Sequence, residues 1–177
     1  HKLLLCTVFM STAATAAEPI EEIVVTAARV PQSLRSVGSA IDVLTEADIA
    51  ARPRFNVADL LREIPGMAVN RSGGLGGFTQ VRIRGAEANQ TVVLIDGVQV
   101  GDPFNNSEFD FANLLTSGVG RIEVLRGAQS ALYGAQAIGG VVNIITAQTD
   151  GPAKLAIEGQ GGSFGTYILG FLSDHYG

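Results

Sequence analysis

The residue types that most often carry out catalysis are scarce in this sequence. It contains two histidines, His1 and His175, one at each end, and a single cysteine, Cys6. Because both histidines lie at the ends of the sequence, no internal Ser-His or Cys-His pair can form an activated nucleophile, and no Cys/His zinc site can form. Neither a Gly-x4-Gly-Lys-Ser/Thr phosphate loop nor a Gly-x-Ser-x-Gly nucleophile elbow is present. We therefore predict that the chain is not an enzyme and binds no cofactor.

One stretch is rich in oxygen-bearing side chains that could coordinate calcium. Its members are Asp102, Asn105, Asn106, Glu108 and Asp110. Their spacing lacks the glycine and the terminal glutamate of an EF-hand loop. The preferred interpretation is a solvated loop, with no metal site, and calcium binding remains the alternative.

Charge and composition argue against two classes of protein, those that bind nucleic acid and those that are wholly disordered. The 177 residues include 12 Lys+Arg and 17 Asp+Glu, giving a net charge of −5 without a basic cluster. This balance argues against binding to nucleic acid. A hydrophobic content of 46% excludes wholesale disorder, and the length predicts one domain with flanking segments. The 22 glycines are about 12% of the chain against a usual ~7%, which predicts many tight turns.

Residues 1–17 have the pattern of a secretory signal peptide. A basic Lys2 precedes the apolar run 3–10, and small residues follow up to Ala14-Thr15-Ala16. The run is far shorter than the ~20 residues of a membrane-spanning helix, and a buried terminal helix or strand is the alternative. Cleavage would remove Cys6 together with this leader.

Two short helices are predicted between residues 45 and 64. Thr45 and Asp48 form a capping box for the first, and Asn56 is a good N-cap for the second. Pro65-Gly66 should end the second helix. Its apolar stripe consists of Val57, Leu60, Leu61 and Ile64.

Short strands surround these helices. They are predicted at 23–26, 40–44, 67–70, 81–83, 92–95, 98–100, 122–125 and 141–146, with one helical turn at 130–133. Asp96-Gly97 predicts a two-residue hairpin turn, because both positions need a positive φ. We expect 31–39 to be linker or turn, and the strand at 23–26 to have no partner close in sequence. From residue 153 to 171 alternating residues flank a turn at 162–165, as in an outer-membrane barrel hairpin.

An ordered series of short motifs runs along residues 20–150. They are Glu22-Ile-Val-Val-Thr-Ala27, Ile64-Pro-Gly66, Ile83-Arg-Gly85, Leu94-Ile-Asp-Gly-Val98, Arg121-Ile-Glu-Val-Leu-Arg-Gly127, Ala131-Leu-Tyr-Gly134 and Ala137-Ile-Gly-Gly-Val-Val-Asn-Ile-Ile-Thr146. In this order they resemble the plug of TonB-dependent outer-membrane receptors, and the cobalamin-receptor branch is the most similar.

The resemblance implies an α+β fold, a plug with a mixed β-sheet and short helices, inside a barrel of ~22 strands. It divides the chain into a signal peptide at 1–17, a TonB box and flexible N-terminus at 18–30, the plug at 31–150, and the first, truncated hairpin of the barrel at 151–177. Localisation in the outer membrane of a Gram-negative bacterium is also implied.

Three groups of site residues follow from the resemblance. Glu22, Ile23, Val24, Val25 and Thr26 would add as a strand to a sheet of TonB, the alternative being an ordinary edge strand. Arg84 and Arg126 would pair with glutamates of the barrel wall as a lock, the alternative being a solvated face. Ligand contacts are expected from loop residues Phe78, Asn89, Gln90, Phe104, Asn105 and Asn106.

The implied function is that of gate and ligand-recognition part of an active transporter for iron–siderophore or cobalamin-type ligands. Its partners would be TonB with the inner-membrane energising complex, the ligand, and the outer membrane through the barrel. Since ~10 residues per strand make roughly 220 for the barrel, the chain is expected to be a fragment. The alternative is a stand-alone periplasmic adaptor with a plug-like fold and no transport activity, which a stop codon directly after Gly177 would favour.

Overall fold

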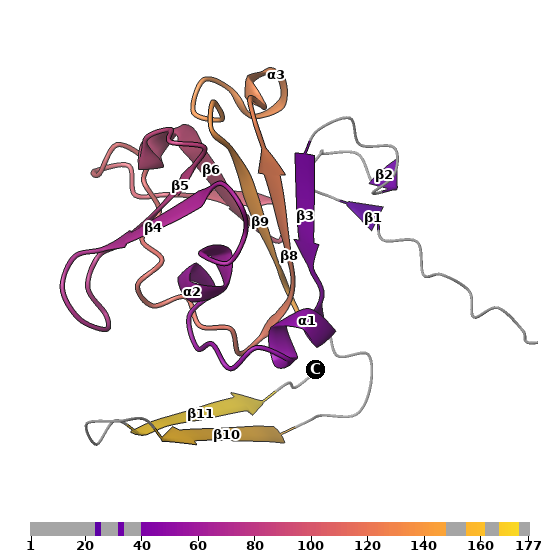
Figure 1. Ribbon diagram of the computed structural model, residues 1–177, viewed down its shortest axis with the longest axis vertical. Coiled ribbons are helices and arrows are strands. Elements are labelled where there is room, and N and C mark those ends of the chain that lie inside the picture. The colour runs from indigo at the N-terminus through magenta and orange to yellow at the C-terminus, as the bar shows by residue number, and fades with distance from the viewer. Residues whose placement is uncertain (1–23, 26–31, 34–39, 148–154, 162–166, 174–177) are drawn as a thin grey trace, which may run out of the picture.

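The computed structural model describes residues 24–25, 32–33, 40–147, 155–161 and 167–173 (Figure 1). The predicted signal peptide, the positions Glu22, Ile23 and Thr26, and the turn at 162–165 lie outside these residues. The elements, in chain order, are β1 (Val24–Val25), β2 (Gln32–Ser33), β3 (Ala40–Leu44), α1 (Glu46–Ala50), α2 (Val57–Leu61), β4 (Met67–Arg71), β5 (Thr79–Ile83), the 3-10 turn η1 (Ala88–Gln90), β6 (Thr91–Ile95), β7 (Val98–Val100), β8 (Val119–Arg126), α3 (Ser130–Tyr133), β9 (Gly140–Thr146), β10 (Leu155–Gly161) and β11 (Tyr167–Ser173).

A five-stranded mixed sheet forms the centre of the fold, in the order β3-β8-β9-β6-β7. Strands β6 and β9 run parallel, and the other neighbours are antiparallel. Strands β4 and β5 form a separate antiparallel pair in which Val69 faces Val81. The α+β class with a mixed sheet and short helices agrees with the prediction.

The main hydrophobic core lies on one face of this sheet. Figure 1 shows α2 between the β4–β5 hairpin and strands β8 and β9. The core joins fully buried residues of these elements, among them Leu60, Leu61, Val81, Ile83, Ile122, Val124, Val142 and Ile144. The alternation predicted for 81–83 is thus confirmed, since Val81 and Ile83 point inward while Arg82 stays partly exposed.

The opposite face of the sheet carries a smaller apolar cluster and a buried charge. Leu125, Val141 and Val92 pack there. Beside them Glu123 is fully buried, with Arg121 Nη2 at 3.0 Å and the Asn143 Nδ2 at 3.2 Å from its two carboxylate oxygens. These partners compensate the cost of burying the carboxylate between two strands.

Both predicted helix N-caps are confirmed. The Thr45 hydroxyl accepts a hydrogen bond from the Asp48 amide at 3.2 Å, and the Asp48 carboxylate accepts from the Thr45 amide at 3.0 Å and from its hydroxyl at 2.7 Å. These hydrogen bonds, first the one from the hydroxyl, hold the pKa of Asp48 below its usual range; nearby Arg52 contributes in the same direction.

The capping box makes a prediction about pH. Because the pKa of Asp48 is lower in the folded chain, its contribution to stability is complete above the unfolded pKa of about 3.9 and is lost as pH falls through the folded value. We expect Asp48→Asn to cost stability at pH 7 and progressively less below pH 4. Urea unfolding at several pH values measures the difference, and a gap that stays constant down to pH 2 would contradict it.

The second helix is shorter than predicted. It ends at Leu61 rather than Ile64, and the amides of Glu63 and Ile64 donate to carbonyls three residues earlier, those of Leu60 and Leu61. Because Pro65 disfavours helical geometry at the residue before it, the last turn tightens instead of continuing. Ile64 is nevertheless buried in the core, as its apolar period predicted.

The prediction for the N-terminal region needs a correction. Val24 and Val25 do have a partner close in sequence, because β1 pairs antiparallel with β2, which lies within the stretch predicted as linker or turn. The two strands form a sheet of their own. Each strand has only two residues, a length that propensity and alternation cannot detect.

The C-terminal strands pair as the alternation predicted. Strands β10 and β11 form an antiparallel sheet of two, with seven residues of each in register. Their place in a barrel stays a prediction. Among the described residues, no helix has the length and apolar character needed to cross a membrane.

Candidate functional site

The loop between β7 and β8 presents an aromatic side chain on a hydrogen-bonded frame. The Asp102 carboxylate accepts from the Phe104 amide at 2.9 Å, and the Asp102 carbonyl accepts from the Ser107 amide at 2.8 Å. Asn106 and Ser107 have φ values of 52° and 62°. Asparagine tolerates this left-handed conformation better than most residues. The frame leaves Phe104 at the tip, 98% exposed.

A second set of hydrogen bonds fixes this loop against β5. One oxygen of the Asp110 carboxylate accepts from the amides of Thr79, at 2.8 Å, and of Ala112, at 2.9 Å. The Gln80 side chain donates to Glu108 at 2.7 Å. The loop therefore lies next to the end of the glycine-rich loop 72–78, whose last residue is the partly buried Phe78.

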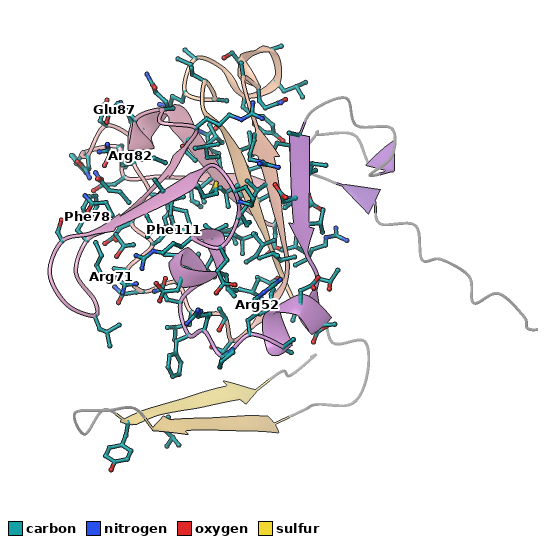
Figure 2. The ribbon with its side chains drawn as sticks, viewed as in Figure 1. Arg52, Arg71, Phe78, Arg82, Glu87 and Phe111 are labelled. Carbon is teal, nitrogen blue, oxygen red and sulfur yellow. The ribbon has the colours of Figure 1, made fainter. Side chains whose placement is uncertain are left out.

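An open groove of about 520 Å³ lies at the base of the same loop. It is lined by Gln99, Val100, Gly101, Asp102, Glu108, Phe109 and Asp110. Phe109 packs edge-on against Phe111, with ring centroids 4.8 Å apart, and Phe111 is buried (Figure 2). The groove thus combines polar and acidic groups with one aromatic wall, a mixture suited to a polar ligand with rings.

The carboxylates of this loop are engaged with donors of the protein. Asp102 and Asp110 accept amide hydrogen bonds, and Glu108 accepts from Gln80. Within the described ranges, no three His, Cys, Asp or Glu residues are grouped so as to hold a metal ion. The solvated-loop interpretation and the calcium alternative both stay predictions.

The predicted ligand residues differ in their exposure and in their hydrogen bonds. Phe104, Asn105 and Asn106 are exposed on one loop, close to the loop that ends at Phe78. Gln90 has structural contacts instead, because its side chain accepts from the Glu87 amide and its carbonyl from the Gly139 amide. Asn89 precedes it in η1 and is partly buried. Arg82 Nη2 lies 3.4 Å from Glu87 Oε2. Figure 2 shows these two side chains near each other.

Asp96 is a structural residue in the described fold. The hairpin turn is confirmed, with φ values of 49° at Asp96 and 79° at Gly97. Both carboxylate oxygens of Asp96 accept from Thr146, one from its amide and one from its hydroxyl, each at 2.9 Å. The turn thereby fixes the end of β9, where the chain leaves the sheet.

The two arginines predicted as a lock lie close together, at the ends of β5 and β8. Both side chains approach Gly66: a Cβ atom added there would lie 3.7 Å from Arg84 Cγ and 4.0 Å from Arg126 Cδ. Arg126 also forms an ion pair of 2.6 Å with Asp42 of β3. Asp42 was not identified from the sequence, since no local pattern indicates a contact between residues so far apart.

Comparison with known proteins identifies the fold. Residues 33–141 match the family model of the TonB-dependent Receptor Plug Domain. The chain belongs to this family. The plug is therefore part of a receptor family rather than an enzyme, as the scarcity of catalytic residues predicted.

Similar proteins include transporters and receptors. The plug is 42% identical over 147 residues to the vitamin B12 transporter BtuB of Photobacterium profundum, a match covering 83% of this chain and 24% of the transporter. It resembles the ferric yersiniabactin uptake receptor FyuA of Yersinia pestis at 27% identity and TM-score 0.58, over 75% of this chain and 21% of that one. It also resembles the ferric enterobactin receptor PfeA of Pseudomonas aeruginosa (mutant G324V) at 32% identity and TM-score 0.57, over 77% of this chain and 21% of that one. The chain thus spans about a quarter or less of these relatives.

Proposed function

We propose that this chain is the plug and gate of a TonB-dependent active transporter in the outer membrane of a Gram-negative bacterium. The transported ligand is of the cobalamin or iron–siderophore type. The observation that carries the proposal is the plug-family match together with 42% identity to a vitamin B12 transporter over most of the chain. Strands β10 and β11 would begin the surrounding barrel, consistent with their antiparallel register.

In this proposal the exposed loops recognise the ligand. The loop carrying Phe104, Asn105 and Asn106 offers one aromatic face and amide groups for hydrogen bonds, and the groove at its base adds polar walls. Its internal hydrogen bonds reduce the entropy lost when a ligand binds.

The gate would respond to TonB through β1. An extended segment can add to another sheet by main-chain hydrogen bonds, and β1 is already extended. Within the described residues it pairs only with β2, so one strand edge is available and the existing pair, two residues long, is weak. TonB would either extend this sheet or replace β2.

A plug exchange tests the proposed function. Residues 18–147 of this chain would replace the corresponding segment of the P. profundum BtuB, and uptake of labelled cyanocobalamin would be measured in cells with and without TonB. We expect TonB-dependent uptake. A chimera that reaches the outer membrane and carries neither cobalamin nor a ferric siderophore would contradict the proposal.

A proline in β1 should weaken binding of this segment to TonB. Val25→Pro removes a backbone donor from the strand, so we expect a peptide of residues 18–29 to bind the TonB C-terminal domain at least about tenfold more weakly. Ala28→Pro, outside the predicted TonB-binding segment, is the matched control and should bind normally. Isothermal titration gives both affinities, and undiminished binding of Val25→Pro excludes strand addition.

A further inference from the structure

A pocket of about 450 Å³ lies at the end of the sheet where β8 begins and β9 ends. It is bounded by α1 and the segment that follows it, by the turn before β8 and by the residue after β9; Figure 2 shows Arg52 close to α1 in this region. The lining residues are Glu46, Ile49, Ala50, Arg52, Pro53, Arg54, Thr116, Ser117, Gly118, Val119 and Ala147. None of them lines the groove at the base of the Phe104 loop, so the pocket is separate from the candidate ligand site.

Two arginines bring positive charge to this pocket. The Arg54 amide donates to the Arg52 carbonyl at 2.7 Å, which closes a tight turn around Pro53. Both side chains reach the same carboxylate, that of Glu63, which accepts a hydrogen bond from Arg54 Nε at 2.9 Å and lies 3.4 Å from Arg52 Nε. Glu63 does not itself line the pocket, so it orients the two guanidinium groups without occupying the space between the walls.

Most terminal nitrogens of these two arginines remain available as donors. Arg52 Nη1 donates to the Asp48 carbonyl at 3.2 Å. For Arg52 Nη2 and both Nη atoms of Arg54, the part of the chain that the structure describes supplies no hydrogen-bond acceptor. The two side chains are accessible to solvent, with exposed fractions of 35% and 51%. Planar guanidinium groups with free donors bind carboxylate and phosphate oxygens in pairs.

The turn before β8 adds backbone donors. The Val119 amide donates to the Thr116 carbonyl at 3.1 Å. Because φ is 85° at Gly118 and is not positive at Ser117, this is a type II turn. Within the described ranges, the amides of Ser117 and Gly118 donate to no acceptor. Free backbone amides beside arginine side chains form a suitable environment for an oxyanion.

The remainder of the lining is apolar, with a single carboxylate. Ile49 and Val119 are buried and supply apolar surface. The carboxylate is that of Glu46, which is exposed to solvent. Two guanidinium groups and one carboxylate leave the lining with a net positive charge, in a protein whose total charge is −5. The volume of the pocket is in the range of sites for small organic molecules and is larger than a bare ion requires.

We infer that this pocket binds a small organic anion, a carboxylate or phosphate group attached to an apolar body. Arg52 and Arg54 hold the oxyanion together with the free amides of the 116–119 turn, and the apolar body lies against Ile49 and Val119. The inference does not rest on the proposed function, since the pocket shares no residue with the candidate ligand groove.

Nuclear magnetic resonance of the full chain tests the inference, with phenyl phosphate and benzoate as the probes at constant ionic strength. We expect both anions to shift the amide signals of Ser117 and Gly118 until they saturate. Inorganic phosphate lacks the apolar body and should bind at least about tenfold more weakly than phenyl phosphate. Benzyl alcohol has a similar body without the charge and should produce no saturable shift.

Three substitutions test the contribution of charge. Arg54→Gln should weaken the binding of phenyl phosphate at least about tenfold. Arg62→Gln is the matched control and should leave the affinity unchanged, because Arg62 is similarly exposed, at 54%, pairs with Asp59 and does not line the pocket. Glu46→Gln removes the carboxylate of the lining and should strengthen binding at least about twofold.

The absence of saturable shifts with both anions would overturn the inference. So would equal affinities for phenyl phosphate and benzyl alcohol, or a loss in Arg54→Gln no larger than in Arg62→Gln. Equal affinities for phenyl phosphate and inorganic phosphate would overturn the ligand class, because the apolar body would then contribute nothing. The three substituted side chains are exposed; if a variant nevertheless failed to fold, the four titrations of the wild-type chain would decide. Neither transport nor TonB is involved, so failure here is distinct from failure of the plug exchange.

Discussion

Replacing Asn56 by alanine is expected to lower the free energy of unfolding by about 3–5 kcal/mol. Asn56 is 5% exposed, and its side chain makes three hydrogen bonds. Its Oδ1 accepts from the Ala58 amide at 2.8 Å as the N-cap of α2, and its Nδ2 donates to the carbonyls of Phe111, at 3.0 Å, and Ala112, at 2.8 Å. Alanine removes the cap and leaves two buried carbonyl groups without this donor.

Urea unfolding followed by circular dichroism measures the effect. Thr45→Ala is the control, because it removes the other N-cap at a more exposed position and should cost only about 1 kcal/mol. Asn56→Asp separates the two contributions: aspartate can still cap the helix, but it cannot donate to the two carbonyls. If Asn56→Ala cost no more than Thr45→Ala, the long-range hydrogen bonds would contribute nothing.

Asn56 also affects the candidate ligand loop, because its side chain binds the segment that follows this loop. Phe111 and Ala112 directly follow Asp110, which fixes the Phe104 loop to β5. The Asn56 side chain thereby anchors the base of the candidate ligand loop to α2. A destabilised variant should also show faster hydrogen exchange in residues 102–112, ahead of the central sheet.

Local features of this fold could be predicted from the sequence. The capping box at Thr45, the N-cap at Asn56 and the turn at Asp96-Gly97 each depend on a few neighbouring residues and on backbone sterics. The alternation around Val81 likewise reports which face is buried. Such signals are local, and the structure confirms them.

Contacts between distant segments could not be predicted in the same way. The resemblance indicated that Arg126 matters, but its partner Asp42 comes from a strand near the other end of the plug. The Asp110 carboxylate, assigned to a solvated loop or to calcium, binds the amides of Thr79 and Ala112. Only the pairing of strands far apart in sequence brings such groups together, and composition and periodicity carry no information about it.

Gly140→Ala is the second change with a large expected effect, a loss of about 2–5 kcal/mol. Gly140 begins β9, where it pairs with Arg126 of β8 on one side and Thr91 of β6 on the other. Its φ is 152°, a conformation that side chains disfavour. An added Cβ would overlap the carbonyl oxygen of Leu125 and lie 3.0 Å from Ile83 Cδ1. Backbone lies on one side and a buried core side chain on the other, so neither neighbour can move away without cost.

Gly74→Ala is the matched control, because its Cβ would meet no atom within 4 Å and its φ is not in the positive range. It should leave the urea midpoint unchanged. Gly140 also adjoins Arg126 and Ile83, so its substitution should displace the strand ends at which Arg84 and Arg126 lie. We therefore expect the Nε–Hε signals of Arg84 and Arg126 to shift in Gly140→Ala under native conditions. Loss of stability without any shift of these signals would mean that the strand ends are positioned independently of the glycine.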